Sequence, residues 1–391
     1  MPGSALGADL KVFGTPVVMV IAAGILATGS RSPFGFSLAE GPTLPDEQTA
    51  LLEAFAQTDP IDAHVHLYKD DLAFSRLMGR LKLHALDICV IDDRDPDYSG
   101  LEPQRSEVLK VRERTGGRAA FCTTFSPYDF EKPEFSQRVI RQLNEDFAEG
   151  AVAVKIYKVM GMEMKSKTGK YVMADDPAFE PIYKDIAAHN RTVVAHLAEP
   201  DSCWQPPNPA SPDYEYYKGH PGEYAYAHPE WPPKAAILAA RDHLVAENPT
   251  LRVVGAHLGS MESDVDQMAQ RFDRYHNFAV DTAARVPYFM LQPRAKVQAF
   301  LIKYQDRILY GTDLVVLPKD DTQKAIAEWN STYARDWKFF ATDQTVEYKG
   351  RTYRGLALPE PVLRKIFHDN AVHWYPGILS SPGRPEPSQY Q

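Results

Sequence analysis

The feature that most constrains this chain is the alternation of short apolar runs with segments of helical spacing. Strand-like runs occupy residues 59–67, 85–92, 118–126, 151–158, 191–198, 251–258, 277–283 and 306–313. Between them, apolar residues recur at i, i+3, i+4 and i+7, most clearly in 178–189 and 262–275. Strands that alternate with helices pair in parallel through right-handed crossovers. The pattern therefore predicts an α/β fold with a parallel sheet.

The length of this region favours one parallel architecture over the other. The stretch from residue 59 to residue 313 is close to the ~250 residues typical of a (β/α)8 TIM barrel. The alternative, an open doubly wound sheet, normally has a Gly-rich phosphate-binding turn after an early strand. No such turn follows the first or second run. We therefore predict a (β/α)8 TIM barrel.

Two long insertions follow the fifth and eighth runs, because residues 199–232 and 318–357 exceed ordinary barrel connections. The first is rich in Pro, Tyr and Trp, and we expect it to form a lid or substrate wall over the barrel mouth. The second reads as a long loop whose aromatic residues pack rather than bind a ligand. Helices are predicted at 45–57, before the barrel, and at 359–376, where the helix should close the barrel.

The N-terminus predicts the cellular compartment. Residues 12–30 carry no charge, and an apolar core at 17–27 is followed by the small residues Ser37 and Ala39. This core is too short for a spanning helix and is typical of a signal peptide. We predict a signal peptide or N-terminal anchor at 1–39, a barrel domain at 40–379 and a disordered tail at 380–391. The protein is then exported, periplasmic or extracellular, with no stable membrane span unless the leader stays uncleaved.

Composition narrows the choice of partners. The formal net charge is −9 and there is no long basic run, which argues against nucleic acid. We expect a small-molecule substrate and allow for a homo-oligomer. Cys89 and Cys122 lie within apolar runs and are predicted to be buried thiols.

Polar residues interrupt the apolar runs near their C-terminal ends, where barrel enzymes build their active sites. The first run carries Asp62, His64 and His66, which share one face if the strand is unbroken. Later runs carry Lys155, His196, His257 and Asp313. A buried imidazole or charge costs several kcal/mol unless it is paired or bound to a metal. The convergence of these side chains at one mouth predicts a metal site.

The same residues resemble the signature of the metal-dependent amidohydrolase superfamily. Six short sequence motifs are similar to those of the amidohydrolase-related branch: DAHVH, VKIY, AHLAEP, AHLGS, YGTDL and NAVHWY. This branch also contains the aminocarboxymuconate-semialdehyde decarboxylase-like enzymes. The resemblance covers roughly residues 59–376, apart from much of the two insertions.

The resemblance and the donor chemistry imply roles for these residues. His64, His66 and Asp313 would hold a divalent metal, and nitrogen and carboxylate donors favour Zn. Asp313 would also accept a proton from the attacking water and return it to the leaving group.

The number of metal ions depends on Lys155. In binuclear members of the superfamily the corresponding lysine is carboxylated and bridges two metals, and His196 and His257 serve as further ligands. In mononuclear members His196 joins the single ion and His257 is catalytic. Lys155 otherwise points at substrate or out of the barrel. Lys158 is expected to face the opposite way on a continuing strand.

Other polar residues are candidates for substrate contact. Arg285, together with Asp281 after the seventh run, lies near the predicted mouth and could clamp a substrate carboxylate. Glu199, His220 and His228 lie in or next to the first insertion. The remaining histidines follow helix or helix-end patterns and are expected to be structural: His84, His189, His243, His276, His368 and His373.

We therefore predict a metal-dependent hydrolase that attacks a C–O or C–N bond of a small molecule. The alternative is a metal-dependent, non-oxidative decarboxylase of an aromatic or unsaturated carboxylic acid, although export favours hydrolysis. A further alternative is a non-catalytic metal-binding barrel.

Overall fold

A computed structural model describes residues 46–93 and 99–380 of the chain. The predicted leader at 1–39 and all but the first residue of the predicted tail lie outside the described residues, so these two assignments remain predictions. No helix in the described part combines the length and apolar character that a membrane span requires.

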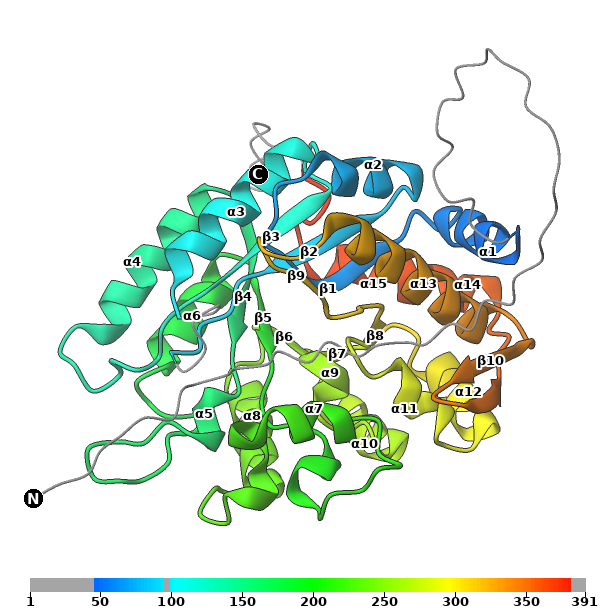
Figure 1. Cartoon of the computed structure of the whole chain (residues 1–391). Coiled ribbons are helices and arrows are strands. Elements are labelled where there is room, and N and C mark those ends of the chain that lie inside the picture. The colour runs from blue at the N-terminus through cyan, green and yellow to red at the C-terminus, as the bar shows by residue number, and fades with distance from the viewer. Residues whose placement is uncertain (1–45, 94–98, 381–391) are drawn as a thin grey trace, which may run out of the picture. The chain divides into compact units, whose positions relative to one another are not determined.

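One parallel sheet organises the described residues (Figure 1). Its hydrogen-bonded order is β8-β7-β6-β5-β4-β3-β2-β1-β9. The strands are β1 (Ile61–Leu67), β2 (His84–Ile88), β3 (Ala119–Thr124), β4 (Ala151–Ile156), β5 (Thr192–Ala195), β6 (Arg252–Gly255), β7 (Phe278–Asp281), β8 (Ile308–Leu309) and β9 (Leu314–Val316).

The sheet closes on itself, because β8 and β9 are the two ends of one chain segment. β8 pairs with β7, and β9 pairs with β1. Between the two strands, Ala63 N–H donates to the carbonyl of Tyr310 at 2.8 Å, and Asp313 N–H donates to the carbonyl of His64 at 2.8 Å. The seam between the first and last strands is therefore hydrogen-bonded, and the predicted TIM barrel is confirmed.

Helices cover the outside of the sheet (Figure 1). They include α2 (Leu72–Arg80), α3 (Leu101–Arg114), α4 (Phe135–Ala148), α6 (Glu180–Ala188), α8 (Lys234–Glu247), α10 (Val265–Arg274) and α12 (Arg294–Lys303). The predicted periodicity is observed in α10, where Val265, Met268 and Phe272 are buried. Its first turn is capped by Asp264, whose side chain accepts the N–H of Asp266.

Two apolar layers lie on the two sides of the sheet. The inner layer consists mainly of small and β-branched side chains such as Ala153 and Val254. At its base are Trp374 and Tyr375, from the end of the C-terminal helical region. That region comprises α14 (Glu360–Arg364), a π-helical turn (Lys365–Asp369) and α15 (Asn370–Trp374). The prediction that this region closes the barrel is confirmed.

The two insertions differ in structure. Residues 199–232 contain only short helical elements: 3-10 turns at Asp201–Trp204, Pro221–Glu223 and Ala225–Ala227, and helix α7 (Tyr214–Gly219). The expectation of a long loop at 318–357 is wrong, because this insertion contains α13 (Thr322–Ala341) and a hairpin of β10 (Thr345–Tyr348) and β11 (Arg351–Arg354). Its aromatic residues do pack, since Trp329, Tyr333 and Phe340 are buried. Lys349 Nζ, at the hairpin turn, donates to the Pro212 carbonyl at 2.5 Å and joins the two insertions.

A register irregularity in β1 corrects one expectation. The pairing of β1 with β2 shifts between Asp62 and Val65, and such a bulge changes which side chains face each side of the sheet. Asp62 therefore does not share a face with His64. Its carboxylate accepts hydrogen bonds from the Thr312 hydroxyl at 2.6 Å and from the Tyr333 hydroxyl of α13 at 3.0 Å.

Candidate metal centre and active-site cavity

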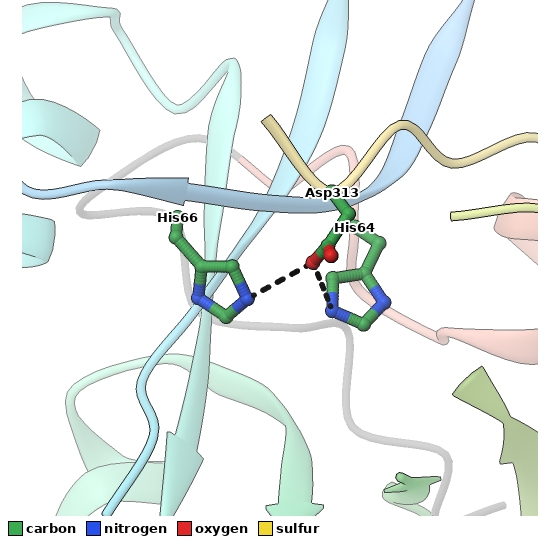
Figure 2. A group of neighbouring side chains, drawn as sticks. All are labelled: His64, His66 and Asp313. Carbon is green, nitrogen blue, oxygen red and sulfur yellow. Dashed lines mark ion pairs between the residues drawn. The ribbon is translucent and has the colours of Figure 1, made fainter. Parts of the chain in front are cut away.

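Three side chains converge across the barrel seam. His64 and His66 come from β1, and Asp313 lies in the segment between β8 and β9. Figure 2 shows the Asp313 carboxylate between the two imidazole rings, with Oδ1 at 3.4 Å from Nε2 of each histidine. One donor atom from each residue lies within 4.8 Å of the others. Close approach follows from closure of the barrel, which places the two segments side by side.

Hydrogen bonds at the far side of each ring fix the imidazole tautomers. His66 Nδ1 lies 2.7 Å from the Ile88 carbonyl, which can only accept, so Nδ1 carries the proton. His64 Nδ1 lies 2.9 Å from the carboxylate of Asp281. Burial raises the pKa of Asp281 to about 6, so this carboxylate is ionised at neutral pH and accepts the proton of Nδ1. Both Nε2 atoms therefore present lone pairs.

The chemistry of this donor set fits a divalent cation. Two nitrogen lone pairs and a carboxylate oxygen face one another, and none of these three atoms carries a proton. A cation bound between them would remove their mutual electrostatic repulsion. Burial lowers the pKa of His64 well below its ordinary value, which keeps this imidazole neutral, as metal ligation requires. The carboxylate-to-histidine hydrogen bond from Asp281 is the usual support of a metal-binding imidazole.

Lys155 lies next to the same donors. Its side chain is buried and Nζ donates to His64 Nε2 at 3.1 Å. The alternative in which this lysine points out of the barrel therefore does not apply. Burial lowers the pKa of Lys155, and the negative charges of Asp313 and Asp281 offset only part of this effect.

His196 and His257 form a separate pair beside the three donors. They follow the ends of β5 and β6, and His257 Nε2 lies 3.2 Å from His196 Nδ1. His257 Nδ1 lies 3.0 Å from the Ala283 carbonyl and therefore carries a proton. Burial lowers the pKa of His257 well below its ordinary value and that of His196 to about 3, so both rings are neutral. His257 Nδ1 is 4.0 Å from Asp313 Oδ2.

The Asp313 carboxylate is ionised and reaches the cavity. Burial raises the pKa of Asp313, whereas positive charge on His257, His66 or His64, when one of these rings is protonated, lowers it. The side chain is 27% exposed, whereas His64 is fully buried. Asp313 is therefore the ligand candidate with an oxygen open to a substrate or water.

A cavity of about 520 Å³ lies above these residues. This volume is within the usual range for small-molecule sites. His66, Lys155, His196, His257 and Asp313 form part of its lining. The first insertion supplies Asp213, Tyr216, Tyr217, His220 and Glu223, and the hairpin of the second supplies Tyr348. The predicted role of residues 199–232 as a wall of the mouth agrees with this lining.

Lys158 also lines the cavity, contrary to the expectation that it faces the opposite way. β4 ends at Ile156, so the strand alternation does not extend to Lys158. Its ammonium binds the carboxylates of Glu199 and Glu223, the latter at 2.5 Å. These ion pairs connect the end of β4 to the first insertion.

Arg285 and Glu199 lie in the cavity wall, as expected of substrate contacts. The Arg285 guanidinium is 3.7 Å from the carboxylates of Glu199 and Asp213, beyond hydrogen-bonding distance. Its buried Nε has no hydrogen-bond partner among the residues that the structure describes. His228 is not among the cavity-lining residues; its ring stacks on Trp231 with centroids 4.5 Å apart.

Several residues in and behind the cavity wall are not identified by the sequence patterns. Strand alternation predicts that Lys158 faces away, but β4 ends at Ile156, and no sequence pattern pairs Asp281 with His64. Asp213, Tyr217 and Glu223 come from an insertion without regular periodicity, so no strand or helix rule indicated their direction. The dense tyrosines of that insertion were the one available signal.

Solved structures with a similar fold are distant in sequence. An uncharacterized TIM-barrel protein from Bordetella bronchiseptica is 14% identical, with a TM-score of 0.46 over 82% of this chain and 99% of that chain. A probable 2-pyrone-4,6-dicarboxylic acid hydrolase from Acinetobacter baumannii is 11% identical (TM-score 0.45; 81% and 99%). The 2,6-dihydroxybenzoate decarboxylase from Rhizobium is 15% identical (TM-score 0.46; 80% and 98%).

The family comparison covers most of the chain. No curated protein sequence matches it significantly. A model of the amidohydrolase family, Amidohydro_2, matches residues 61–377. The match begins at the first residue of β1 and ends after α15, and it includes His64, His66 and Asp313. The chain therefore belongs to the amidohydrolase family.

Proposed function

We propose that this protein is a metal-dependent hydrolase that adds water across a C–O or C–N bond of a small molecule. The observation that carries the proposal is the position of Asp313. One carboxylate oxygen lies between the two imidazole nitrogens of β1, while the side chain remains open to the cavity. A carboxylate placed in this way can hold a cation and accept a proton from water.

His64, His66 and Asp313 would hold the cation, with His196 and Lys155 as the further candidates. A divalent metal bound there supplies Lewis acidity and makes water easier to deprotonate near neutral pH. Zn suits this mixture of nitrogen and carboxylate donors.

The protein's own groups would perform the proton transfers. Asp313 is ionised and reaches the cavity, so it accepts the proton of the attacking water. His257 lies 4.0 Å from Asp313 Oδ2 and is the neighbouring neutral acid–base group. A proton held at Asp313 can then be returned to the leaving oxygen or nitrogen, as general acid catalysis requires.

Arg285 would orient the substrate. Its guanidinium is nearly buried, and its carboxylate neighbours at 3.7 Å are too far for hydrogen bonds. An oxyanion or carbonyl oxygen of the substrate would satisfy these donors. Glu199, which binds Lys158 and approaches His196 at 3.6 Å, would position this wall of the cavity.

The reaction can be tested with protein of measured metal content and a panel of small lactones, esters and amides in ¹⁸O-labelled water. The expected result is metal-dependent turnover with one labelled oxygen in the acid product. Asp313→Asn should lower kcat by a factor on the order of 10²–10⁴, as loss of a general base does. The exposed Asp343 offers a matched control, and Asp343→Asn should leave turnover unchanged.

The decarboxylase alternative gives a different result in the same experiment. Release of CO₂ from aromatic or unsaturated carboxylic acids, without incorporation of labelled oxygen, would contradict the hydrolase proposal. Protein that binds no divalent metal, together with unchanged turnover in His64→Ala, would contradict the metal-dependent mechanism as a whole.

A further inference from the structure

A second cavity, of about 450 Å³, lies beside the candidate active site. It is formed by the first insertion together with Glu262, Ser263 and Tyr288. None of the candidate metal ligands lines it. Its volume is again that of a small-molecule site, and the proposed function leaves it unexplained.

Three of the four tyrosines that line this cavity have their hydroxyl groups engaged by other residues. Tyr217 donates to the Glu199 carboxylate at 3.3 Å, and Tyr288 donates to the Asp213 carboxylate. Tyr224 donates to the backbone carbonyl of Gln205. With the hydroxyls held in place, the aromatic rings of these residues remain to form the lining.

The apolar lining favours a flat ring. Tyr217 and Tyr224 are stacked with centroids 5.3 Å apart and an interplanar angle of 19°. Pro206, Pro207 and Pro221 supply further rigid apolar surface. Aromatic side chains stack favourably with a planar ring, a gain of about 0.5–1.5 kcal/mol per pair beyond the buried area. Serine and amide side chains, such as Ser211 and Asn208, provide hydrogen-bonding groups.

The charges of the lining are paired within the protein. Lys234 Nζ lies 2.6 Å from Asp201 and 3.5 Å from Glu262, and Asp201 N–H donates to Glu262 at 2.9 Å. Lys218 lies 3.6 Å from Glu215. A charged ligand would lose its hydration in this cavity, and the lining offers no unpaired opposite charge to offset that cost. The lining therefore favours a neutral ligand.

We propose that this second cavity binds a neutral aromatic small molecule that carries a hydroxyl or amide group. The site is separate from the active-site cavity, but the two share a wall. Tyr217 lines both cavities. Tyr288 lines the second cavity while its hydroxyl holds Asp213, which lines the first. Both carboxylates held by these tyrosines face Arg285, so the wall connects the second site to the proposed substrate anchor.

Saturation-transfer NMR on the full-length protein provides the test, with phenol as the probe and cyclohexanol as the non-aromatic control of similar size. Gln205 lines the second cavity and is exposed, so Gln205→Trp should fill the cavity while Gln205→Ala leaves it open. Val315 lines the active-site cavity and is 40% exposed, so Val315→Trp should fill that cavity instead. Asn208→Trp is a second filling variant if Gln205→Trp fails to fold.

We expect phenol to bind the wild type, Gln205→Ala and Val315→Trp with similar Kd. A filling variant of the second cavity should raise Kd by about tenfold or more, equivalent to ~1.4 kcal/mol. Absence of phenol binding to the wild type would overturn the proposal. So would equal binding of cyclohexanol, or loss of phenol binding in Val315→Trp with retention in Gln205→Trp. These outcomes do not depend on whether the reaction is hydrolysis.

Discussion

At the scale of single residues, the candidate metal centre depends on atoms that would not touch the metal. The Ile88 carbonyl and the Asp281 carboxylate fix the protons of His66 and His64 on Nδ1. Asp281 does more than this, because its other oxygen accepts the backbone N–H groups of His257 and Ala283 at 2.8 and 3.2 Å. A single carboxylate thus orients a ligand and the segment that follows β6.

We predict that Asp281→Asn lowers affinity for divalent metal by about 10–100-fold. The amide oxygen can keep the two backbone hydrogen bonds, which leaves the amide NH₂ facing His64 Nδ1. His64 would then carry its proton on Nε2, where a metal ligand needs a lone pair. Metal affinity can be measured by chelator competition. Unchanged affinity in a folded variant would show that the tautomer of His64 does not depend on Asp281.

A second prediction concerns His84, which was expected at a helix end but is the first residue of β2. Arg118 Nη1 lies 3.2 Å from its Nε2. Burial, followed by the positive charge of Arg118, lowers the pKa of His84 to about 4. Between the pKa of ~6.5 in the unfolded chain and this value, only the unfolded state binds the proton. The stability contributed by neutral His84 is therefore complete above pH ~6.5 and is lost as pH falls towards 4.

Denaturant unfolding of the wild type and His84→Gln between pH 7.5 and 4.5 tests whether the free energy of unfolding falls on acidification because of His84. The wild type should lose about 1 kcal/mol more than the variant on acidification, after allowance for solvent screening of a partly exposed ring. His243→Gln is the control, because that side chain is 60% exposed. A pH dependence that is identical in wild type and His84→Gln would contradict the prediction.

Sequence patterns identify individual residues of the site correctly wherever the alternation of a strand holds. His64, His66, Lys155, His257 and Asp313 all come from strand ends, and the structure brings them together. Lys158 departs from the predicted alternation because β4 ends at Ile156. Asp62 was misjudged because a bulge is not visible in a run of apolar residues.

At the scale of elements, the ends of the barrel strands share an unusual backbone conformation. Left-handed φ values occur after β5 at Ala198 (65°), after β6 at His257 (60°), after β7 at Ala284 (55°) and after β8 at Asp313 (65°). Non-glycine residues pay a free-energy cost in this region. Because these positions are not glycines, the sequence carried no signal of the sharp turns that direct His257 and Asp313.

The cost of this conformation can be measured away from the site. Ala357 has φ 48°, is exposed, and its N–H donates to the Thr342 carbonyl at 2.9 Å. Ala357→Gly keeps this hydrogen bond and removes the Cβ, so it should raise the free energy of unfolding by about 0.5–1 kcal/mol.

A matched substitution in a helix should have the opposite sign. Ala327 is exposed within α13, and Ala327→Gly should lower the free energy of unfolding by about 1 kcal/mol. Chemical denaturation of both variants provides the comparison. Destabilisation by Ala357→Gly would show that the left-handed residue is not strained.

At the scale of the whole molecule, the candidate metal ligands connect the two ends of the barrel. His64 and His66 belong to its first strand, and Asp313 precedes its last paired segment, β9. A metal held by these residues would bridge the seam where the sheet closes. The fold itself was predictable, because periodicity and length reflect burial on both faces of a parallel sheet. The structure of the second insertion was not predictable from the sequence, because the extent of α13 depends on how it packs and not only on its capping residues.

We therefore predict that divalent metal stabilises the entire barrel. Added at ~100 times its Kd, the metal should raise the free energy of unfolding by about 2.7 kcal/mol. The shift should appear as a higher Tm by calorimetry, reversed by a chelator, and should be absent in the double variant His64→Ala, His66→Ala. A metal-independent Tm in protein shown to bind metal would contradict the bridging position.

The wall shared by the two cavities limits which substitutions can alter the substrate range of this protein. Tyr217 lines both cavities, and Tyr288 lines the second cavity while its hydroxyl holds Asp213, which lines the first. A substitution in this wall that is selected for a new substrate will also reshape the second cavity. A substitution selected for a new ligand of the second cavity will likewise reshape the active-site cavity. Directed evolution of substrate range should therefore proceed more freely at Val315 and Leu317, which line the active-site cavity alone. The tyrosine wall would be the part of the site least free to diversify.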